Sequence, residues 1–509
     1  MDFSSIFTND IKIILPEIFI VSSILVLIIH GVLLTASSVY NFPLINKSVS
    51  YLSVLILIFT LLILYNNPIF FRVIFNNIFI FDDLAFFAKM FIIISALACL
   101  LMSQDYVDYY RLNSFEYCVL ILFAVVGLLL LISSCDLISA YLAIEIQSLS
   151  FYVLASFKRN SVFSTEAGLK YFILGAFSSS LILFGSSILY GFTGTTNFQN
   201  LFYLLNDISQ NTSNDILIYG YKFYYYYTAI IIASLFIAIG LLFKLAAAPF
   251  HMWSPDVYEG SPMSSTALFA IVPKIAILVL FIRIFLNNFF SEIYWWQIII
   301  VLCAITSVLI GSFVALKQRK IKRLIAYSAI SHVGYLLIAF ATGTFIGIQA
   351  LFFYIIIYMI TGISIWVILL STKLLNDKQN NGQNLVDLSS LVNTNPLLAI
   401  TFAITIFSLA GVPPLAGFYA KMQIFLASIE SSMYIVSIIG IMSSVISTFY
   451  YIRVIKILYF EKSLSWNFYR SMNQNKSLLL GISLFIFIFI FINPNLLNLY
   501  TYKMCINIF

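Results

Sequence analysis

The chain has 509 residues, of which 62% are hydrophobic and only 9% are charged, and its formal net charge is +6. Soluble domains carry about 25% charged residues, so this composition excludes a water-soluble fold and favours a chain surrounded by membrane lipids. Lysines and arginines between the hydrophobic stretches account for the positive charge, and we expect no nucleic-acid partner.

The first stretch, MDFSSIFTNDIKIILPEIF, contains Asp2, Asp10 and Glu17 and no arginine. Import peptides are amphipathic and rich in arginine, and secretory signals begin with basic residues, so the stretch is typical of neither. We expect the chain to be made in the compartment whose membrane it enters. Its abundant Ile, Phe, Asn, Tyr and Lys are typical of an AT-rich genome, such as that of an organelle or an AT-rich bacterium.

About fourteen hydrophobic stretches are long enough to cross a membrane as helices, which takes about 20 residues. They are residues 12–34, 48–65, 84–102, 117–134, 136–156, 165–190, 228–249, 264–286, 294–316, 323–342, 345–371, 396–429, 433–459 and 477–493. The twelfth is too long for one straight crossing, and GVPPLAGF (Gly411–Phe418) interrupts it. We expect polar loops after the sixth and eleventh stretches. The sequence therefore predicts an all-α polytopic membrane protein with about 14 transmembrane helices.

These helices fall into four predicted segments. Residues 1–116 form an N-terminal three-helix segment, and residues 461–509 form a C-terminal helix and tail. Residues 117–290 contain helices 4–8, and residues 291–460 contain helices 9–13. Hydrophobic segments that are interrupted at corresponding places in two halves are typical of transporters built from inverted repeats. We therefore predict two inverted repeats of five helices each, with broken helices 7 and 12.

Basic residues are distributed unevenly between the loops, and inner loops of membrane proteins carry the excess of Lys and Arg. Loops after odd-numbered helices carry sixteen of the 26 basic residues, whereas the other loops and the two termini carry five. This asymmetry predicts an even number of crossings with both termini outside. The remaining five, 26 − 16 − 5, lie within hydrophobic stretches: Lys89, Lys170, Lys244, Lys274 and Lys421.

A lysine at the centre of a bilayer costs about 2.5–3.5 kcal/mol on insertion scales, and such residues usually face the protein interior or water. Lys89 lies close to a membrane edge, where its amine could instead reach the interface. Glu166 and Lys170 are four residues apart, so a simple ion pair along one helix is an alternative to a functional role. For these two residues we favour function, because Lys170 lies a full turn further into the helix.

Lys244 precedes a helix breaker, Pro249, in FKLAAAPFHMWSPDVYEGSP (Phe243–Pro262). Proline cannot donate a backbone hydrogen bond, and freed backbone groups at membrane depth are tolerated only inside protein or beside a water-filled cavity. The pattern predicts a hydrated cavity in which Lys244 gains and loses a proton. The same combination of proline and lysine occurs twice more: Pro273 directly precedes Lys274, and a proline pair precedes Lys421.

Glu145 is the only acid that we place deep inside a predicted helix, and a buried carboxylate needs a partner. We expect it to pair with Lys244. His332 lies deep in a helix of the second half, between the two lysine sites; it is either a hydrogen-bonded core residue or, as we favour, a proton relay, because imidazole titrates near neutral pH. His251 is expected to orient the loop after Pro249.

No cofactor motif is found in the sequence. The five cysteines are scattered without a C-x-x-C pair, and the three histidines have no ligand spacing that would build a zinc site. Neither a GxGxxG motif nor a P-loop occurs. We therefore expect no metal and no cofactor on this chain, and any linked redox chemistry must lie in a partner.

Four motifs carry a family resemblance: FKLAAAPFHMWSPDVYEGSP, ALFAIVPKIAIL, LIAYSAISHVGYLL and LAGVPPLAGFYAK. Together they resemble subunit 2 of respiratory NADH:ubiquinone oxidoreductase (complex I), one of three antiporter-like chains of its membrane arm. The resemblance covers roughly residues 80–460. The motif WSPDVYEGSP and the lysine after Pro273 distinguish this chain from the sister subunits 4 and 5. Subunit 4 would be expected to carry glutamate in place of Lys421.

The resemblance implies a subunit of an NADH:ubiquinone reductase that translocates protons. NADH, FMN, iron–sulfur clusters and ubiquinone would bind to partner subunits, and the neighbours would be the antiporter-like subunit 4 and subunits of the 4L type. By the same resemblance, Glu145 and Lys244 would be the charged pair of helices 5 and 7. Lys274 and His332 would form the central relay, and Lys421 the second-half site. Glu166 and Lys170 match a further charged pair of the family.

The resulting hypothesis is a proton relay from Lys244 by way of Lys274, water and His332 to Lys421, with the charge of Glu145 controlling the protonation of Lys244. Three alternatives stay open. The chain could belong to a separate cation/proton antiporter, or it could be a lipid-facing scaffold whose charges hold helices together. It could also be the plastid relative of the same subunit, although a multi-pass, organelle-encoded protein of the mitochondrial inner membrane is our expectation.

Overall fold

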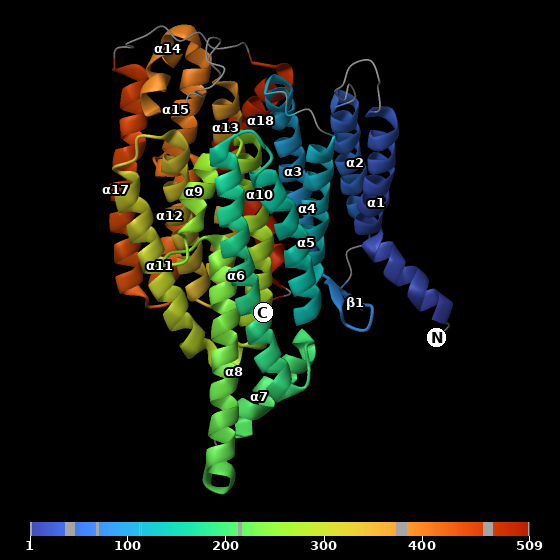
Figure 1. Ribbon diagram of the computed structural model, residues 1–509. Helices are drawn as coiled ribbons and strands as arrows, with labels where there is room; N and C mark the ends of the chain where they lie inside the picture. The colour runs from blue at the N-terminus through green and yellow to red at the C-terminus, as the bar shows by residue number, and fades with distance from the viewer. Residues whose placement is uncertain are drawn as a thin grey trace.

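The computed structural model describes residues 3–35, 46–67, 71–110, 112, 115–211, 216–372, 384–461, 472–506 and 508. Most of this chain is a bundle of upright helices (Figure 1). α1 begins at the lower end of the bundle in this view, and the C-terminal end is also marked in the lower half. The even number of crossings that the loop charges predict agrees with this arrangement.

The N-terminal part consists of α1 (Phe3–Thr35), α2 (Asn46–Asn66) and α3 (Asp83–Tyr109). A small antiparallel hairpin, β1 (Arg72–Ile74) and β2 (Phe79–Phe81), connects α2 to α3. α3 begins where it does because the side chain of Asp82 accepts a hydrogen bond from the backbone N–H of Ala85, which satisfies one of the free donors of its first turn. α1 and α2 lie at the edge of the bundle in Figure 1.

The next part of the chain builds the first half of the bundle. Its elements are α4 (Glu116–Ser133), α5 (Leu137–Ala155), α6 (Val162–Thr193), α7 (Phe198–Asn211), α8 (Ile216–Leu245), α9 (Trp253–Gly260) and α10 (Met263–Ile282). Every residue of α10 is buried, and apart from Lys274 its polar residues lie in the first turn, which fits a helix that is surrounded by protein. α10 contacts α3, α4, α5, α8 and α13 and is thus the central helix of the molecule.

The second half begins with a six-residue π-helix, η1 (Arg283–Asn288), and a short 3₁₀ turn, η2 (Phe290–Glu292). Then follow α11 (Ile293–Ala315), α12 (Ile321–Ala341), α13 (Phe345–Ser371), η3 (Leu385–Ser390), α14 (Leu391–Thr394), α15 (Pro396–Ala410), α16 (Ala416–Glu430) and α17 (Tyr434–Tyr459). The C-terminal elements are α18 (Gln474–Ile492) and α19 (Asn495–Ile506).

Thirteen helices in the described part of the chain are long and apolar enough to cross a membrane. The predicted twelfth crossing is the pair α15 and α16, each of 15 residues, separated by Gly411–Leu415. Together they give the fourteen crossings expected. The predicted break in helix 7 is also confirmed, because α8 ends at Leu245 and the chain re-enters a helix only at Trp253. By contrast, α10 continues through Pro273 without a break.

Three features were not predicted from the sequence. The hairpin of β1 and β2 adds two strands to an otherwise helical chain. α7 lies within the polar loop expected after the sixth crossing, and α19 follows the last crossing. The polar loop expected after the eleventh crossing lies largely outside the described residues.

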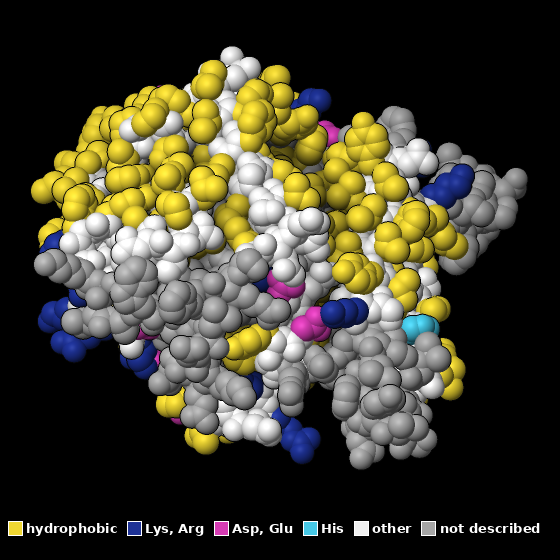
Figure 2. Space-filling model, turned by 90° about the horizontal axis from the view of Figure 1, so that it is seen from above, with side chains coloured by type: hydrophobic (Ala, Val, Ile, Leu, Met, Phe, Trp, Pro, Cys, Tyr) yellow, Lys and Arg dark blue, Asp and Glu magenta, His cyan; other side chains and the backbone are white. Residues whose placement is uncertain are grey.

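Large exposed hydrophobic side chains cover the sides of the bundle, as expected for a surface that faces lipid. Examples are Leu169 and Ile173 on α6 and Ile435 and Met442 on α17, each more than 60% exposed. Figure 2 shows the upper end of the bundle, where Lys and Arg side chains are distributed around the rim and Asp and Glu lie beside some of them.

Candidate functional site

Lys244 lies at the break between α8 and α9. α8 ends one residue later, and Ala246 adopts a left-handed backbone conformation with φ of 61°. The indole of Trp253 then donates a hydrogen bond to the carbonyl of Phe243 at 2.9 Å, which satisfies one backbone acceptor at the end of α8. The Lys244 amine is half-buried and donates to the hydroxyl of Tyr152 on α5 at 3.5 Å.

The predicted ion pair between Glu145 and Lys244 is not formed. The Glu145 carboxylate instead accepts a long hydrogen bond, 3.4 Å, from Ser148, and its other oxygen is buried without a partner. Ser148 and Tyr152 are four residues apart and share one face of α5, so two hydroxyl groups lie between the acid and the amine.

Lys274 is buried at the centre of the molecule, 5% exposed. Its amine donates to the hydroxyl of Tyr358 on α13 at 2.7 Å and lies 4.3 Å from the centre of the same ring. A cavity of about 30 Å³ is lined by both Lys244 and Lys274, together with Ser148 and Tyr258. Since a water molecule needs about 10–15 Å³ of such space, the cavity has room for water between the two amines.

His332 is held between two tyrosines. Its Nδ1 lies 2.5 Å from the hydroxyl of Tyr354 on α13, and its Nε2 lies 3.1 Å from the hydroxyl of Tyr451 on α17. Both nitrogens of a neutral imidazole can then be satisfied, one as donor and the other as acceptor. The ring is 4% exposed, so this partnership, rather than water, keeps the polar ring in the core.

The Lys421 side chain contacts the backbone at the second helix break. Its amine donates to the carbonyl of Ala410, the last residue of α15, at 2.9 Å. That carbonyl lies among the last four of the helix, which lack partners within it. Gly411, with φ of 82°, ends α15, and a Cβ at this position would come within 2.9 Å of the Lys421 side chain. The break therefore supplies an acceptor and makes room for the lysine.

A second small cavity, of about 10 Å³, is lined by Tyr358, His332 and Lys421. Its lining therefore includes Tyr358, whose hydroxyl accepts the hydrogen bond of Lys274. Five of the predicted residues thus follow one another through the interior as a row, which we call the central row: Glu145, Lys244, Lys274, His332 and Lys421. The sequence did not single out the hydroxyl groups between them, those of Ser148, Tyr152, Tyr354, Tyr358 and Tyr451.

The other two predicted residues, Glu166 and Lys170, lie at the surface. They form the expected ion pair at 2.8 Å, with side chains 54% and 43% exposed. Lys170 also pairs with Asp256 on α9 at 3.0 Å. Arg323 on α12 binds both Asp256 and Glu259, and Lys320 pairs with Glu259. Glu166 and Lys170 therefore belong to a charged cluster around α9 and do not line the cavities of the central row.

Lys89 does not extend to the membrane surface. It is 2% exposed and forms an ion pair of 2.5 Å with Glu17, which is 3% exposed. Glu17 lies in α1, so the interpretation of Glu145 as the only acid deep inside a helix was wrong. A second buried pair joins Asp82 to Arg283 at 2.8 Å. Both pairs connect α3 to another helical segment, α1 in the first case and η1 in the second.

His251 lies in the turn between α8 and α9, outside the membrane-spanning helices. It is 6% exposed, and its Nδ1 is buried without a hydrogen-bond partner. Burial lowers the pKa of the imidazole below its ordinary value, because charging the ring in a low-dielectric environment is unfavourable. The ring is therefore neutral near pH 7, as suits a residue that packs the turn.

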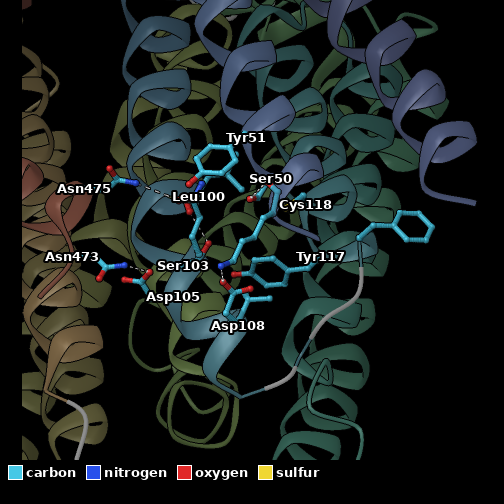
Figure 3. A pocket seen from close by; sticks show the side chains of 14 residues that line it. Ser50, Tyr51, Leu100, Ser103, Asp105, Asp108, Tyr117, Cys118, Asn473 and Asn475 are labelled. Atoms are coloured by element: carbon cyan, nitrogen blue, oxygen red, sulfur yellow. Dashed lines mark hydrogen bonds and ion pairs between the residues drawn. The ribbon is translucent and has the colours of Figure 1, made fainter. Parts of the chain in front are cut away.

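A separate polar cavity of about 140 Å³ lies at the end of α3 (Figure 3). The carboxylate of Asp105 accepts a hydrogen bond from Asn473 and forms an ion pair with Lys476 at 3.0 Å. Lys47 forms an ion pair with Asp108 at 3.7 Å. None of the seven predicted site residues lines it. The contacts of Asp105 attach the start of α18 to α3, and the pair of Lys47 and Asp108 attaches α2 to α3.

No group of three or more His, Cys, Asp or Glu side chains that could hold a metal ion occurs among the described residues. The five cysteines are buried as free thiols. The chemistry available in the central row is therefore that of amines, an imidazole, phenols and a carboxylate, all of which can accept or release a proton.

Residues 134–447 match the family described as NADH:quinone oxidoreductase/Mrp antiporter, TM. The chain is 44% identical to NADH-ubiquinone oxidoreductase chain 2 of Marchantia polymorpha, over 98% of this chain and 99% of the relative. It is 41% identical to chain 2 of Arabidopsis thaliana, over 97% and 96% of the two chains.

A solved structure of respiratory complex I from Thermus thermophilus, with bound aureothin, contains a chain of the same fold. The two superpose with a TM-score of 0.76 at 25% identity, covering 95% of this chain and 98% of the other. The sequence match, the fold and the two broken helices all agree. The chain therefore belongs to the family of antiporter-like membrane subunits of NADH:ubiquinone oxidoreductase, in the branch of chain 2.

Proposed function

We propose that this chain is a core membrane subunit of a proton-pumping NADH:ubiquinone oxidoreductase and that the central row carries the protons. Electron transfer in other subunits would drive the transport, and no redox step takes place on this chain. The observation that supports the proposal is the arrangement of the row: buried amines and an imidazole alternate with hydroxyl groups and two small cavities, from Lys244 to Lys421.

The row allows a proton to move by short steps. Water in the first cavity would connect the Lys244 amine to that of Lys274. The Tyr358 hydroxyl, which accepts the hydrogen bond of Lys274, can donate its own proton into the second cavity, where His332 and Lys421 lie. A hydroxyl serves both as donor and as acceptor, so each step returns the tyrosine to its starting state once it rotates.

The charge of Glu145 would control the first step. Its carboxylate accepts a hydrogen bond from Ser148, one turn before the tyrosine that Lys244 contacts, and no direct ion pair joins the acid to the amine. The neighbouring positions Ile138, Leu142 and Leu149 on α5 are more than half exposed, so Glu145 lies near a side surface of the bundle. A change of charge in an adjacent subunit could therefore act on it.

The chain 2 identity of the relatives suggests the place and the partners. We infer a multi-pass, organelle-encoded subunit of the mitochondrial inner membrane, in contact with the antiporter-like subunit 4 and with subunits of the 4L type. NADH, FMN, the iron–sulfur clusters and ubiquinone would bind to partner subunits. The two plant relatives are consistent with an organelle, and sequencing the genome that encodes the chain would decide between mitochondrion and plastid.

The direct test replaces Lys244 by alanine in the assembled enzyme. We expect assembly to survive and the number of protons pumped per NADH oxidised, measured in proteoliposomes, to fall strongly. Lys317→Ala is the matched control, because Lys317 is exposed and forms none of the ion pairs found in the described part of the chain. Normal pumping by Lys244→Ala would refute the assignment.

The same preparation separates the alternatives. A separate cation/proton antiporter would not co-purify with an NADH-oxidising assembly, whereas the proposed subunit would. If the charges only held helices together, Lys244→Ala would reduce the amount of assembled complex and leave proton pumping per assembled complex unchanged.

A further inference from the structure

A large cavity of about 470 Å³ lies away from the central row and is lined in part by α7, which is at the lower end of the bundle in Figure 1. Its walls come from the β1–β2 hairpin, α7, the π-helix η1 and the C-terminal end of the chain. By the predicted orientation, this is the outer side of the membrane, because the hairpin and α7 both follow even-numbered crossings. None of the proposed proton-carrying residues lines it.

One side of the cavity is polar and holds donors without partners. The guanidinium of Arg283 is 4% exposed and pairs with Asp82 through one terminal nitrogen, but its Nε is buried without a hydrogen-bond partner. The side-chain nitrogen of Asn288, which is 3% exposed, has no partner either. A buried donor without an acceptor costs about 1–3 kcal/mol, and both residues line the cavity, so an acceptor that reached these groups from the cavity would remove that cost.

The local backbone also marks this place. Arg283 and Asn288 are the first and last residues of η1, a six-residue π-helix. Such segments are rare and occur frequently at functional sites. The wider turn places both donors and Leu286 at one cavity.

The remaining wall is apolar. Phe198 and Phe202 of α7 line the cavity together with Leu286 and Phe290. α7 buries Phe198, Leu201 and Leu205 against the protein, whereas Asn200 and Tyr203 are exposed. α7 follows the crossing that ends at Thr193, and η1 is the last part of the crossing Met263–Asn288, so both lie where crossings end. The cavity therefore combines buried donors with an apolar wall at the depth where lipid head groups meet acyl chains.

We propose that this cavity binds a phospholipid of the outer leaflet. Its phosphate or ester oxygens would accept hydrogen bonds from Arg283 Nε and Asn288 Nδ2, and one acyl chain would lie along Phe198, Phe202 and Leu286. Asp82 already balances the charge of Arg283, so the site needs no net negative charge. A phospholipid provides acceptor oxygens directly joined to an acyl chain, which fits both walls.

The test uses the assembled enzyme in membranes that contain a phospholipid with a photoreactive group on its acyl chain. After illumination, we expect labelled peptides from α7 and from residues 283–290. Gln199→Trp should block the cavity, because Gln199 lines it from α7. Asn200→Trp is the matched control, since Asn200 is exposed on the same helix and does not line the cavity. Labelling should fall several-fold in the first variant only.

A second variant tests the polar side. Asn288→Leu keeps the size of the side chain and removes its donor, and we expect retention of the labelled lipid to fall roughly five- to tenfold, the usual effect of one lost hydrogen bond. Equal labelling of all variants would overturn the proposal. It would also be overturned if a photoreactive ubiquinone labelled the cavity in place of the phospholipid, or if a neighbouring subunit became cross-linked there instead.

Discussion

Two regions of this molecule bury lysines in different ways. In the N-terminal region, Lys89 meets a carboxylate, Glu17, at 2.5 Å, with both side chains almost fully buried. In the central row, Lys274 and Lys421 are as deeply buried, yet they meet a phenol and a backbone carbonyl. The first arrangement fixes a charged pair, whereas the second leaves an amine that can be either charged or neutral.

The difference follows from the cost of a buried charge. An ion pair compensates both of its members, so removal of one partner leaves the other unpaired at a cost of about 3–5 kcal/mol. An amine that donates to a neutral oxygen has no opposite charge to hold its proton. Buried pairs therefore connect helices, and buried amines beside hydroxyl groups and cavities are suited to transfer protons.

The largest effect is expected from Lys274→Met. The variant keeps much of the side-chain volume and removes the amine between the two cavities, so proton transfer along the row should stop while the helices stay packed. We expect the pumping rate to fall roughly 100-fold or more, by the usual contribution of a positioned proton carrier. Proton uptake by proteoliposomes after NADH addition measures the pumping rate. Pumping near the wild-type rate would show that the Lys274 amine is not needed for proton transfer.

Lys89→Met should reduce the stability of the complex and leave proton pumping per complex unchanged. It leaves Glu17 buried without its cation, and we expect a loss of stability of about 3–5 kcal/mol, seen as less assembled complex on native gels. Pumping per assembled complex should be unchanged. The double variant Glu17→Gln with Lys89→Met removes both charges and should restore assembly. A lowered ratio of protons to NADH in the single variant would place the N-terminal pair on the proton path.

Tyr358→Phe sharpens the role of the hydroxyl groups. The ring remains in place beside Lys274, and only the acceptor at 2.7 Å is lost. We expect pumping to slow roughly tenfold, the effect of about one hydrogen bond at the transition state, with a larger solvent isotope effect in D₂O. Tyr335→Phe is the control, because the Tyr335 hydroxyl faces Ser443 and not Lys274. Equal slowing of both variants would count against a specific role for Tyr358.

The sequence was sufficient for much of the fold and for part of the site. Hydrophobic length predicted the crossings, and the prolines predicted both broken helices, because each signal is local to one segment. The partners of the lysines were not predictable in the same way. Tyr358 lies 84 residues from Lys274, and Glu17 lies 72 residues from Lys89, so only the packing of distant helices brings them together.

For Glu145, the sequence indicated the wrong direct partner. The sequence paired it with Lys244 because both are charged and lie on neighbouring helices. The structure instead inserts Ser148 and Tyr152, two hydroxyl groups on the face of α5 that also carries Glu145. A serine three residues after an acid and a tyrosine seven residues after it are the local signal that could have indicated this path, since both spacings keep the side chains on one face.

The smallest effect is expected from Lys170→Gln. Lys170 is 43% exposed and belongs to the charged cluster around α9, in which Asp256 and Arg323 keep their own pair. Exposed ion pairs contribute little, so pumping should change by less than roughly twofold. Any loss of thermal stability should appear at low ionic strength and vanish in high salt, because salt screens exposed charges. A strong loss of pumping that persists in high salt would extend the proton path from the central row to this surface cluster.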